Sequence, residues 1–351
     1  MKKTTSFIQS LAQSKTVRIG ALCVLTFLAT GCDMVNEDLA ECPTALTLRY
    51  VFDYNMERAN AFHSQVDCVT LYILDSEGNL IDKLEETSSV LSDESYRVNL
   101  DLEPGTYSFV AVGGSACEKT SFHITHPQHG EHRNALNMQL PLDENRESDA
   151  KLHDLFFGEV SNVVVEKYKN TQVTLPMIKD TNSLQVMLQE LNSPFIVDVD
   201  DYEFHIEADN DFLGPDNEPV STGGMTYRPH TLENKMAGYA VTSGNYLYTD
   251  ENTPVQVAST EFHLSRLMTQ NADKTFLVVT SKEKGAVNIR VPLIDYLAMS
   301  RHSGHSWIQS DQEYLDRQST WNLMFFLQSG RWVETKVAVN DWIVRFNHAG
   351  M

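Results

Sequence analysis

Residues 68–86 read CVTLYILDSEGNLIDKLEE, two largely apolar runs around the turn-forming segment DSEGN. A period of two places successive side chains on opposite faces of a strand, so each run predicts a half-buried β-strand. Gly78 supplies the backbone freedom that a short connection between such strands needs. The stretch therefore predicts a β-hairpin, and the same pattern recurs through the rest of the chain.

Strand-like runs lie on both sides of this hairpin. LTLRYVFDY (46–54) precedes it, and YRVNLDLEPGTYSFVAVGG (96–114) predicts a second hairpin that turns at Pro104-Gly105. NALNMQLPL (134–142) closes this first set of strands. The charged segment DENRESDA (143–150) then interrupts the pattern, and we expect a domain boundary within it.

Beyond this break, short runs rich in Val, Ile, Leu, Phe and Thr continue almost to the end of the chain. They occupy residues 162–168, 172–178, 183–191, 202–208, 257–264, 275–282, 285–293, 321–328 and 332–346. Only 292–301 and 312–318 favour helices, and both are short. Strands in series without α/β alternation predict an all-β protein with two β-sandwich domains, residues 45–146 and 147–351.

The first 31 residues differ from the rest. Four basic residues and no acidic ones precede or flank the apolar stretch IGALCVLTFLAT (19–30), which is too short to span a bilayer. The following Ala29-Thr30-Gly31-Cys32 resembles the lipobox of bacterial lipoproteins. We therefore expect residues 1–31 to be a lipoprotein signal peptide, Cys32 to be acylated and residues 32–44 to form an acidic tether. The alternatives are an ordinary signal peptide and a buried apolar helix.

The net charge constrains the partners. Loss of residues 1–31 removes four positive charges, so the formal charge changes from −21 to −25. Such an acidic chain repels phosphate backbones and anionic headgroups, which excludes nucleic acid as a partner. We expect several acyl chains on Cys32 to provide the membrane attachment, because one short chain binds only marginally.

Export also determines the state of the cysteines. Cys42, Cys68 and Cys117 remain after acylation of Cys32, in an environment that permits disulfides. If strands 68–74 and 107–113 are antiparallel neighbours, Cys68 comes close to Cys117, so we predict that these two pair. The alternative is that all three are small buried side chains.

Two segments contain residue types that bind metals. FHITHPQHGEH (122–132) carries His123, His126, His129 and His132, but Pro127 and Gly130 prevent a helix that would gather them. EADNDFLGPDNE (207–218) resembles a calcium loop without its central glycine and closing glutamate. We expect a solvated loop for the first segment, and no metal or cofactor in either.

Catalytic motifs are absent from the sequence. It contains no nucleophile elbow, metalloprotease helix, P-loop or dinucleotide fingerprint, and acid groups such as Asp198, Asp200 and Asp201 are expected by chance in so acidic a chain. Aromatic residues near the end could stack on sugars or form the core of terminal strands, and we favour the core. They are Trp321, Phe325, Phe326, Trp332, Trp342 and Phe346. We therefore expect neither an enzyme nor a small-molecule substrate.

Several stretches in order resemble the fimbrial-anchor family of type V fimbriae, the FimB-type minor-subunit lipoproteins of Bacteroidia. They are CDMVNEDLAECP, LRYVFDYN, VDCVTLYILDSEGNLI, LEPGTYSFVAVGG, LHDLFFGEV, YLDR, WNLMFFLQ and VAVNDWIV, and they span nearly the whole chain after the lipobox. The resemblance implies two tandem transthyretin-like β-sandwiches. It also implies a non-catalytic subunit that anchors the fimbrial shaft to the outer membrane and limits its length.

The resemblance further implies how the shaft would bind. A carboxy-terminal strand at about 333–346 would pair with a shaft subunit by β-strand complementation. The side chains expected to dock the partner strand are Trp332, Val337, Val339, Trp342 and Val344. Acids after Cys32 resemble a surface-export signal, so we expect the protein on the outer leaflet, facing outward. The alternative from another functional class is a surface glycan-binding lipoprotein of a nutrient-uptake system.

Overall fold

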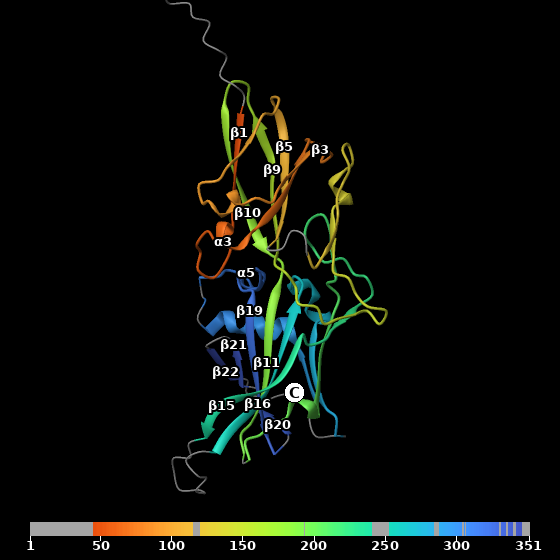
Figure 1. Ribbon diagram of the computed structural model, residues 1–351, viewed down its shortest axis with the longest axis vertical. Coiled ribbons are helices and arrows are strands. Elements are labelled where there is room, and N and C mark those ends of the chain that lie inside the picture. Colours follow the sequence, from red (N-terminus) through yellow and green to blue (C-terminus); the bar gives the residue numbers. More distant parts are fainter. Residues whose placement is uncertain are drawn as a thin grey trace, which may run out of the picture.

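The computed structural model describes most of the chain from residue 45 onward. The described ranges are 45–114, 120–192, 194–240, 253–283, 288–303, 305, 307–329, 331–334, 336–339 and 342–345. Strands dominate these ranges and the helices are short, which confirms the all-β prediction. Figure 1 shows an elongated molecule in which one group of strands lies above another.

The upper group is a seven-stranded sheet in the order β3-β2-β5-β9-β10-β1-β4. The predicted hairpin at 68–86 is confirmed, because β2 and β3 pair antiparallel from Val69 opposite Glu86 to Leu74 opposite Leu80. The strands are β1 (Ala45–Val51), β2 (Cys68–Leu74), β3 (Leu80–Glu86), β4 (Val98–Leu100), β5 (Gly105–Gly114), β9 (Leu155–Val165) and β10 (Asn170–Lys179).

The predicted second hairpin at 96–114 is wrong. β4 pairs with β1, whereas β5 pairs with β2 and β9, so the two strands lie far apart in the sheet. Gly105 is the first residue of β5 and not the apex of a tight turn. β4 contributes Leu100 to the same core as Leu46 and Phe109, and this burial decides its place.

One face of all these strands except β3 shares a single core, so the sheet curves around it. The core includes Leu48, Leu71 and Phe156, none of which is measurably exposed. The short helix α3 (Phe62–Gln65) inserts Phe62 into this core, and Phe62 stacks on Tyr50 at 5.1 Å between ring centroids.

The chain passes between the two groups of strands more than once. β8 (Glu147–Ser148) pairs with a strand of the lower group, but β9 and β10 then return to the upper sheet. The upper sheet therefore does not end at the boundary expected between residues 146 and 147. The division into two transthyretin-like domains stays a prediction.

The lower group consists of two five-stranded sheets, in the orders β15-β16-β11-β19-β20 and β18-β17-β12-β14-β8. Most runs predicted beyond residue 180 coincide with these strands. They are β11 (Asn182–Glu190), β12 (Tyr202–Ala208), β14 (Met225–Tyr227), β15 (Thr231–Ala240), β16 (Thr253–Leu264), β17 (Phe276–Ser281), β18 (Asn288–Pro292), β19 (Thr320–Gln328) and β20 (Arg331–Glu334).

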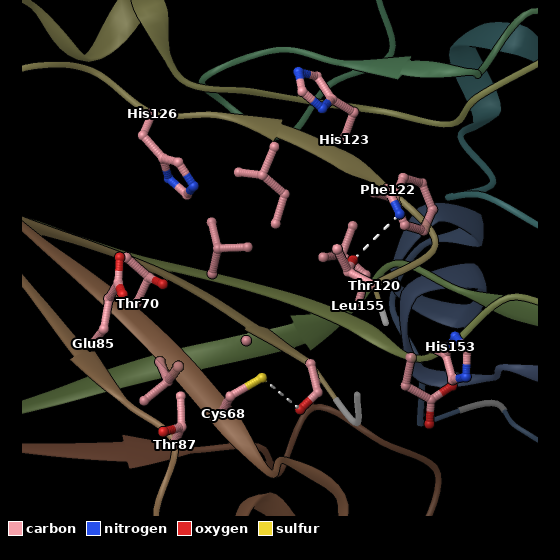
Figure 2. A pocket seen from close by; sticks show the side chains of 16 residues that line it. Cys68, Thr70, Glu85, Thr87, Thr120, Phe122, His123, His126, His153 and Leu155 are labelled. Carbon is pink, nitrogen blue, oxygen red and sulfur yellow. Dashed lines mark hydrogen bonds between the residues drawn. The ribbon is translucent and has the colours of Figure 1, made fainter. Parts of the chain in front are cut away.

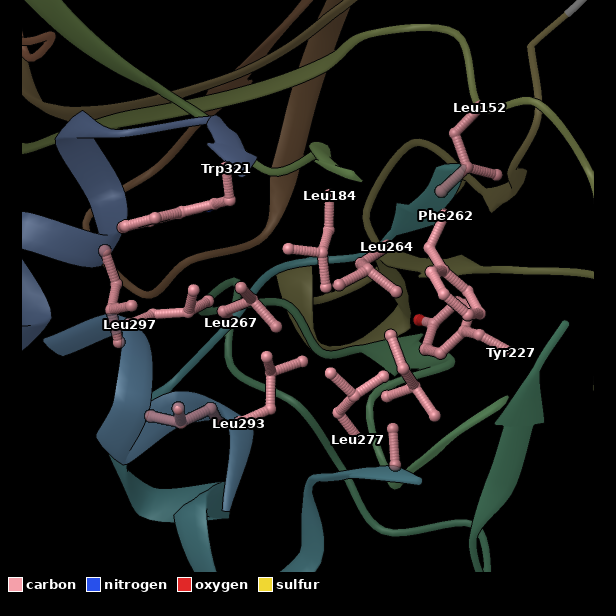
Figure 3. Packing of buried hydrophobic residues seen from close by; sticks show 14 of the residues in the cluster. Leu152, Leu184, Tyr227, Phe262, Leu264, Leu267, Leu277, Leu293, Leu297 and Trp321 are labelled. Atoms are coloured by element: carbon pink, nitrogen blue, oxygen red, sulfur yellow. The ribbon is translucent and has the colours of Figure 1, made fainter. Parts of the chain in front are cut away.

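Large apolar side chains of both sheets meet between them (Figure 3). Leu184, Phe262 and Trp321 come from one sheet, and Tyr227 and Leu277 come from the other. The two helices predicted from sequence are present as α4 (Leu293–Met299) and α5 (Asp311–Arg317). Most apolar residues of α4 are buried, so this helix is part of the core between the sheets.

A three-stranded sheet joins the two halves. It has the order β13-β7-β6, with β6 (His123–Thr125), β7 (Asn137–Gln139) and β13 (Phe212–Leu213). The run 134–142 therefore pairs with a segment from the lower half instead of closing the first set of strands. Its Met138 belongs to one continuous core that includes Tyr72 of β2 and Leu213 of β13.

Cys68 lies at the start of β2, opposite Gly114 at the end of β5. It is disulfide-bonded, and its Sγ lies 3.6 Å from the Gly114 carbonyl oxygen. Every other cysteine, including Cys32 and Cys117, lies outside the described residues. The pairing of Cys68 with Cys117 thus stays a prediction, supported by the antiparallel register that the sequence led us to expect.

No helix within the described ranges is both long and apolar enough to cross a bilayer.

A buried charged cluster lies where β10 continues into β11. Asp180 is fully buried between these strands, and its Oδ1 accepts a hydrogen bond from Asn217 Nδ2 at 2.8 Å. Arg266 Nε lies 3.7 Å from the same oxygen, and Arg266 Nη2 donates to Asp316 Oδ1 at 3.1 Å. One guanidinium thus faces two carboxylates. Burial outweighs the Arg266 charge and raises the pKa of Asp180 to about 7.

A second contact joins the halves at the surface. Arg317 at the end of α5 donates to the carbonyl oxygen of Asn55 at 3.3 Å and to Glu313 Oε1 at 2.8 Å. Its guanidinium carbon lies 3.9 Å from the ring centroid of Tyr54 and 5.4 Å from that of Trp307. Together with the buried cluster, this cation–π contact makes the junction a packed interface and not a bare linker.

Replacement of Asp180 by Asn should remove a pH dependence of folding. Between the ordinary aspartate pKa of 3.8 and about 7, Asp180 is protonated when folded and ionised when unfolded. Its stabilising contribution is therefore full below the lower value and declines as pH rises toward 7. Urea unfolding at pH 5 and pH 7 should show a slope that differs between wild type and Asp180→Asn by roughly 1.4 kcal/mol per pH unit.

Asp209→Asn is the matched control. Burial tends to raise the pKa of Asp209, but hydrogen bonds from Ser221, Lys274 and two backbone amides outweigh it and lower the pKa to about 2. Its stabilising contribution is thus lost only as pH falls from 3.8 toward 2. The control should therefore reduce stability equally at pH 5 and pH 7. Identical slopes for wild type and Asp180→Asn would contradict the assignment.

Candidate functional site

The carboxy-terminal edge of the lower half contains the residues expected to dock a partner strand. β19 pairs parallel with β11 from Thr320 opposite Ser183 to Leu327 opposite Glu190. Its side chains alternate, with Trp321, Leu323, Phe325 and Leu327 completely buried. This alternation fixes the register, because a shift of one residue would expose all four.

β20 follows β19 at this edge of the sheet. It pairs only with Phe326–Gln328, and the register shifts between Phe326 and Leu327. Trp332 lies opposite Leu327, is half-buried, and meets Phe325 edge-on at 6.2 Å between ring centroids. Trp332 is thus anchored on the core at the sheet edge.

The chain continues into a two-stranded hairpin, β21 (Lys336–Val339) and β22 (Trp342–Arg345). The antiparallel register places Val337 opposite Val344 and Val339 opposite Trp342. β21 lies beside β19, so this hairpin borders the same sheet edge as β20. The backbone therefore brings the five predicted docking residues together at one edge. The structure describes the backbone, but not the side chains, at residues 337, 339, 342 and 344.

The opposite edge of this sheet is β15, a long strand with a bulge between Met236 and Gly238. Glu233 and Lys235 form an ion pair of 2.7 Å on it, and a bulge with charged side chains is a common protection against unwanted pairing. The two edges of the sheet thus differ, and the carboxy-terminal edge is the one bordered by a hairpin of aromatic and β-branched residues.

Three of the aromatic residues considered for sugar stacking belong to or pack on the core, among those whose side chains the structure describes. Trp321 is fully buried and donates from Nε1 to Asn182 Oδ1 at 3.1 Å. Phe325 is also fully buried, and Trp332 packs on it. The favoured core interpretation holds for these three residues. Trp307, not singled out from the sequence, is 39% exposed beside Arg317 and Arg58.

The histidine-rich segment does not converge on one point. His126 Nδ1 forms a hydrogen bond of 2.6 Å with the Tyr72 hydroxyl, and burial lowers its pKa. His132 accepts from the backbone amide of Asn134, while His123 and His129 are exposed. Within the described ranges, no three His, Cys, Asp or Glu side chains are arranged to hold a metal ion.

Several side-chain oxygen atoms of the segment 207–218 accept hydrogen bonds from protein donors. Asp209 accepts from Lys274 Nζ at 2.9 Å and from Ser221 Oγ at 2.5 Å. Asn210 Oδ1 accepts from the hydroxyl of Tyr227 at 2.9 Å. Asp198 caps a short 3-10 helix by accepting from the amide of Asp200, so this acid group has a structural contact. Asp198 and Asp209 thus stabilise the loops in which they lie.

A pocket of about 380 Å³ lies between the upper sheet and the segment that carries β6. Figure 2 shows Thr70, Glu85 and Cys68 on one side and His123 and Phe122 on the other. Lys83 holds the pKa of Glu85 below its usual range through a 2.7 Å ion pair. No local sequence pattern predicts this pocket, because its walls come from five separate segments, within residues 68–70, 85–87, 112–114, 120–126 and 153–155.

Comparison with known proteins identifies relatives over most of the chain. The family model of the fimbrillin-A associated anchor proteins Mfa1 and Mfa2 matches residues 39–348. No curated sequence matches significantly. A candidate adhesin from Bacteroides thetaiotaomicron is 39% identical, with a TM-score of 0.77 over 88% of this chain and 100% of that one.

Two further structures are similar. A candidate polysaccharide-binding protein from Bacteroides thetaiotaomicron is 31% identical, with a TM-score of 0.72 over 87% of this chain and 98% of that one. The fimbrial anchor protein Mfa2 from Porphyromonas gingivalis shares the fold, at 16% identity and a TM-score of 0.63 over 87% of this chain and 99% of that one. The family resemblance found in the sequence is confirmed. The chain belongs to the family of fimbrillin-A associated anchor proteins Mfa1 and Mfa2, which are fimbrial accessory subunits associated with the cell surface.

Proposed function

We propose that this protein is a lipid-anchored subunit that holds a fimbrial shaft on the outer membrane and limits its length. The observation that carries the proposal is that the first strand and the carboxy-terminal sheet edge of this chain lie at opposite ends of the molecule. β1 starts at one end of the molecule, directly after the tether, whereas β20 lies toward the other end (Figure 1). A subunit that links a membrane to a shaft needs its two attachments apart.

The shaft would attach by strand pairing at the carboxy-terminal edge. An incoming strand gains affinity from main-chain hydrogen bonds, while alternate side chains set specificity. Trp332, with the β21–β22 hairpin beside it, gives this edge an aromatic and β-branched composition that suits such pairing. The same geometry would limit the length of the shaft. A subunit fixed in the membrane accepts a shaft subunit at only one end, so no further subunit can be added on the membrane side.

The membrane attachment would be the acyl chains on Cys32. The acidic residues that follow, Asp33, Glu37 and Asp38, are proposed as the export signal that brings the protein to the outer leaflet. The packed junction at Asp180 and Arg317 supports a role under tension, because it couples the two halves directly.

The glycan-binding alternative has weaker support. It requires exposed rings along a groove, but Trp321 and Phe325 are buried in the core. One similar structure is described as a candidate polysaccharide-binding protein, and this description applies to that protein alone. The burial of these two rings therefore favours the fimbrial function over glycan binding.

Replacement of Cys32 by Ala should release the fimbriae. The variant carries an ordinary secretory leader so that export continues, and it lacks only the acylated residue. Without acyl chains the acidic chain has little affinity for the membrane, so cell-bound fimbriae should fall by roughly tenfold or more. Immunoblots of cells and medium measure the change. Cys42→Ala is the control and should leave fimbriae on the cells, whereas retention in both variants would refute lipid anchoring.

Replacement of Val344 by Pro should detach the shaft from the anchor. Proline removes a backbone donor and interrupts the β21–β22 ladder, in which Val344 lies opposite Val337. We expect roughly tenfold less shaft protein to co-isolate with the acylated anchor, equivalent to about 1.4 kcal/mol. Lys235→Pro in β15, at the opposite edge of the same sheet, is the matched control. Equal loss in both variants would indicate general destabilisation and contradict docking at this edge.

A further inference from the structure

The turn between β9 and β10 presents apolar side chains at the end of the molecule where β1 begins. We call residues 164–169 the β9–β10 tip. Val164 is 57% exposed and Tyr168 is 44% exposed, although both are large apolar or aromatic residues. Figure 1 shows this turn at the opposite end of the molecule from β15, β16 and β20.

The backbone at Tyr168 makes its exposure unusual. Its φ is 63°, in the left-handed region that Gly or Asn adopts at lower cost. A tyrosine in this conformation makes the folded state less stable than Gly or Asn would at the same position. Residues in such conformations are enriched at functional sites. The tip thus presents an aromatic ring to solvent at some expense to folding.

The charges of the tip suit an interface between water and lipid. Lys167 Nζ lies 4.5 Å from the ring centroid of Tyr168, and Lys169 pairs with Glu166 at 3.0 Å. A phenol ring and lysine stems have apolar bodies with polar ends, a combination that is stable at the level of lipid headgroups. The tip itself carries one positive charge in excess, in contrast to the strongly acidic chain.

The tether leads directly to this tip. Ala45, the first described residue, pairs with Asn170 at the start of β10. Residues 33–44 separate Ala45 from Cys32. Twelve residues reach at most about 43 Å when extended, and a flexible linker of this length spans roughly 20 Å on average. A tip on so short a tether meets the membrane at a high effective concentration.

We propose that the β9–β10 tip rests in the headgroup layer of the membrane that holds Cys32, with Tyr168 and Val164 at the lipid interface. The proposal deepens the lipid-anchoring function and rests on it. Two weak contacts added to the acyl chains would fix the tilt of the subunit, so that its carboxy-terminal edge points away from the surface. Lipid is the favoured occupant because the tether ends beside the tip.

The contact is interfacial and does not depend on electrostatic attraction. Asp101 and Glu103 are exposed on the loop before Gly105, and Gly105 pairs with Val165 of the tip. These carboxylates oppose anionic lipid and offset the excess charge of Lys167. We therefore expect the contact to persist at high salt, where attraction between exposed charges is screened.

Quenching by brominated lipids tests the contact. The acylated protein is reconstituted into vesicles of phosphatidylethanolamine and phosphatidylglycerol whose acyl chains carry bromine near the headgroup. Tyr168→Trp adds a reporter at the tip, and Leu232→Trp adds one at a 54% exposed position of β15 as the matched control. The added emission of Tyr168→Trp should fall about twofold at low and high salt, while that of the control stays unchanged.

The outcomes separate the two proposals. Failure of the acylated protein to float with the vesicles overturns both lipid anchoring and the tip contact. Flotation with equal quenching of the two reporters overturns the tip contact alone. A change in Tyr168→Trp emission that depends on protein concentration and not on bromine assigns the tip to a second copy and also overturns it. Val164→Asp in the Tyr168→Trp background should abolish the selective quenching.

Discussion

The fold depends on one run of backbone that belongs to both halves. β10 pairs with β1 and β9 in the upper sheet and continues, through Asp180 and Thr181, into β11 at the centre of a lower sheet. The geometry of this passage is fixed by Arg266, which faces Asp180 and Asp316 in the interior. The buried guanidinium is costly to disturb, because removal of Asp316, its closer partner at 3.1 Å, would leave an uncompensated charge in the interior.

This constraint has a mechanical consequence for a fimbrial subunit. Force applied at the carboxy-terminal edge reaches β19, which lies directly beside β11 in parallel register. It would then pass along β11 and β10 to β1, the first described strand. The load therefore runs along paired strands, and Arg317, between Tyr54 and Trp307, holds the halves together beside that path. A tip that rests on the membrane would give the same path a defined direction.

Local patterning was sufficient to predict most strands but not their neighbours. The hairpin at 68–86, the strand at 202–208 and the helices at 292–301 and 312–318 follow from alternation or amphipathic spacing within a few residues. The sequence predicted that β4 pairs with β5, whereas it pairs with β1. A strand of only three residues has too short a pattern to identify its neighbour. The pairing of β7 with β13 links segments about seventy residues apart, and no local signal encodes it.

The sequence by itself determined the all-β class, the family and the expected attachment residue Cys32, because periodicity, composition and short motifs are local properties. Only the tertiary structure decided that Trp321 belongs to the core, that β9 and β10 return to the first sheet, and that Asp180, Arg266 and Asp316 meet. It also placed the exposed Tyr168 beside the start of β1. These features depend on which distant segments become neighbours, and burial summed over the whole chain selects those neighbours.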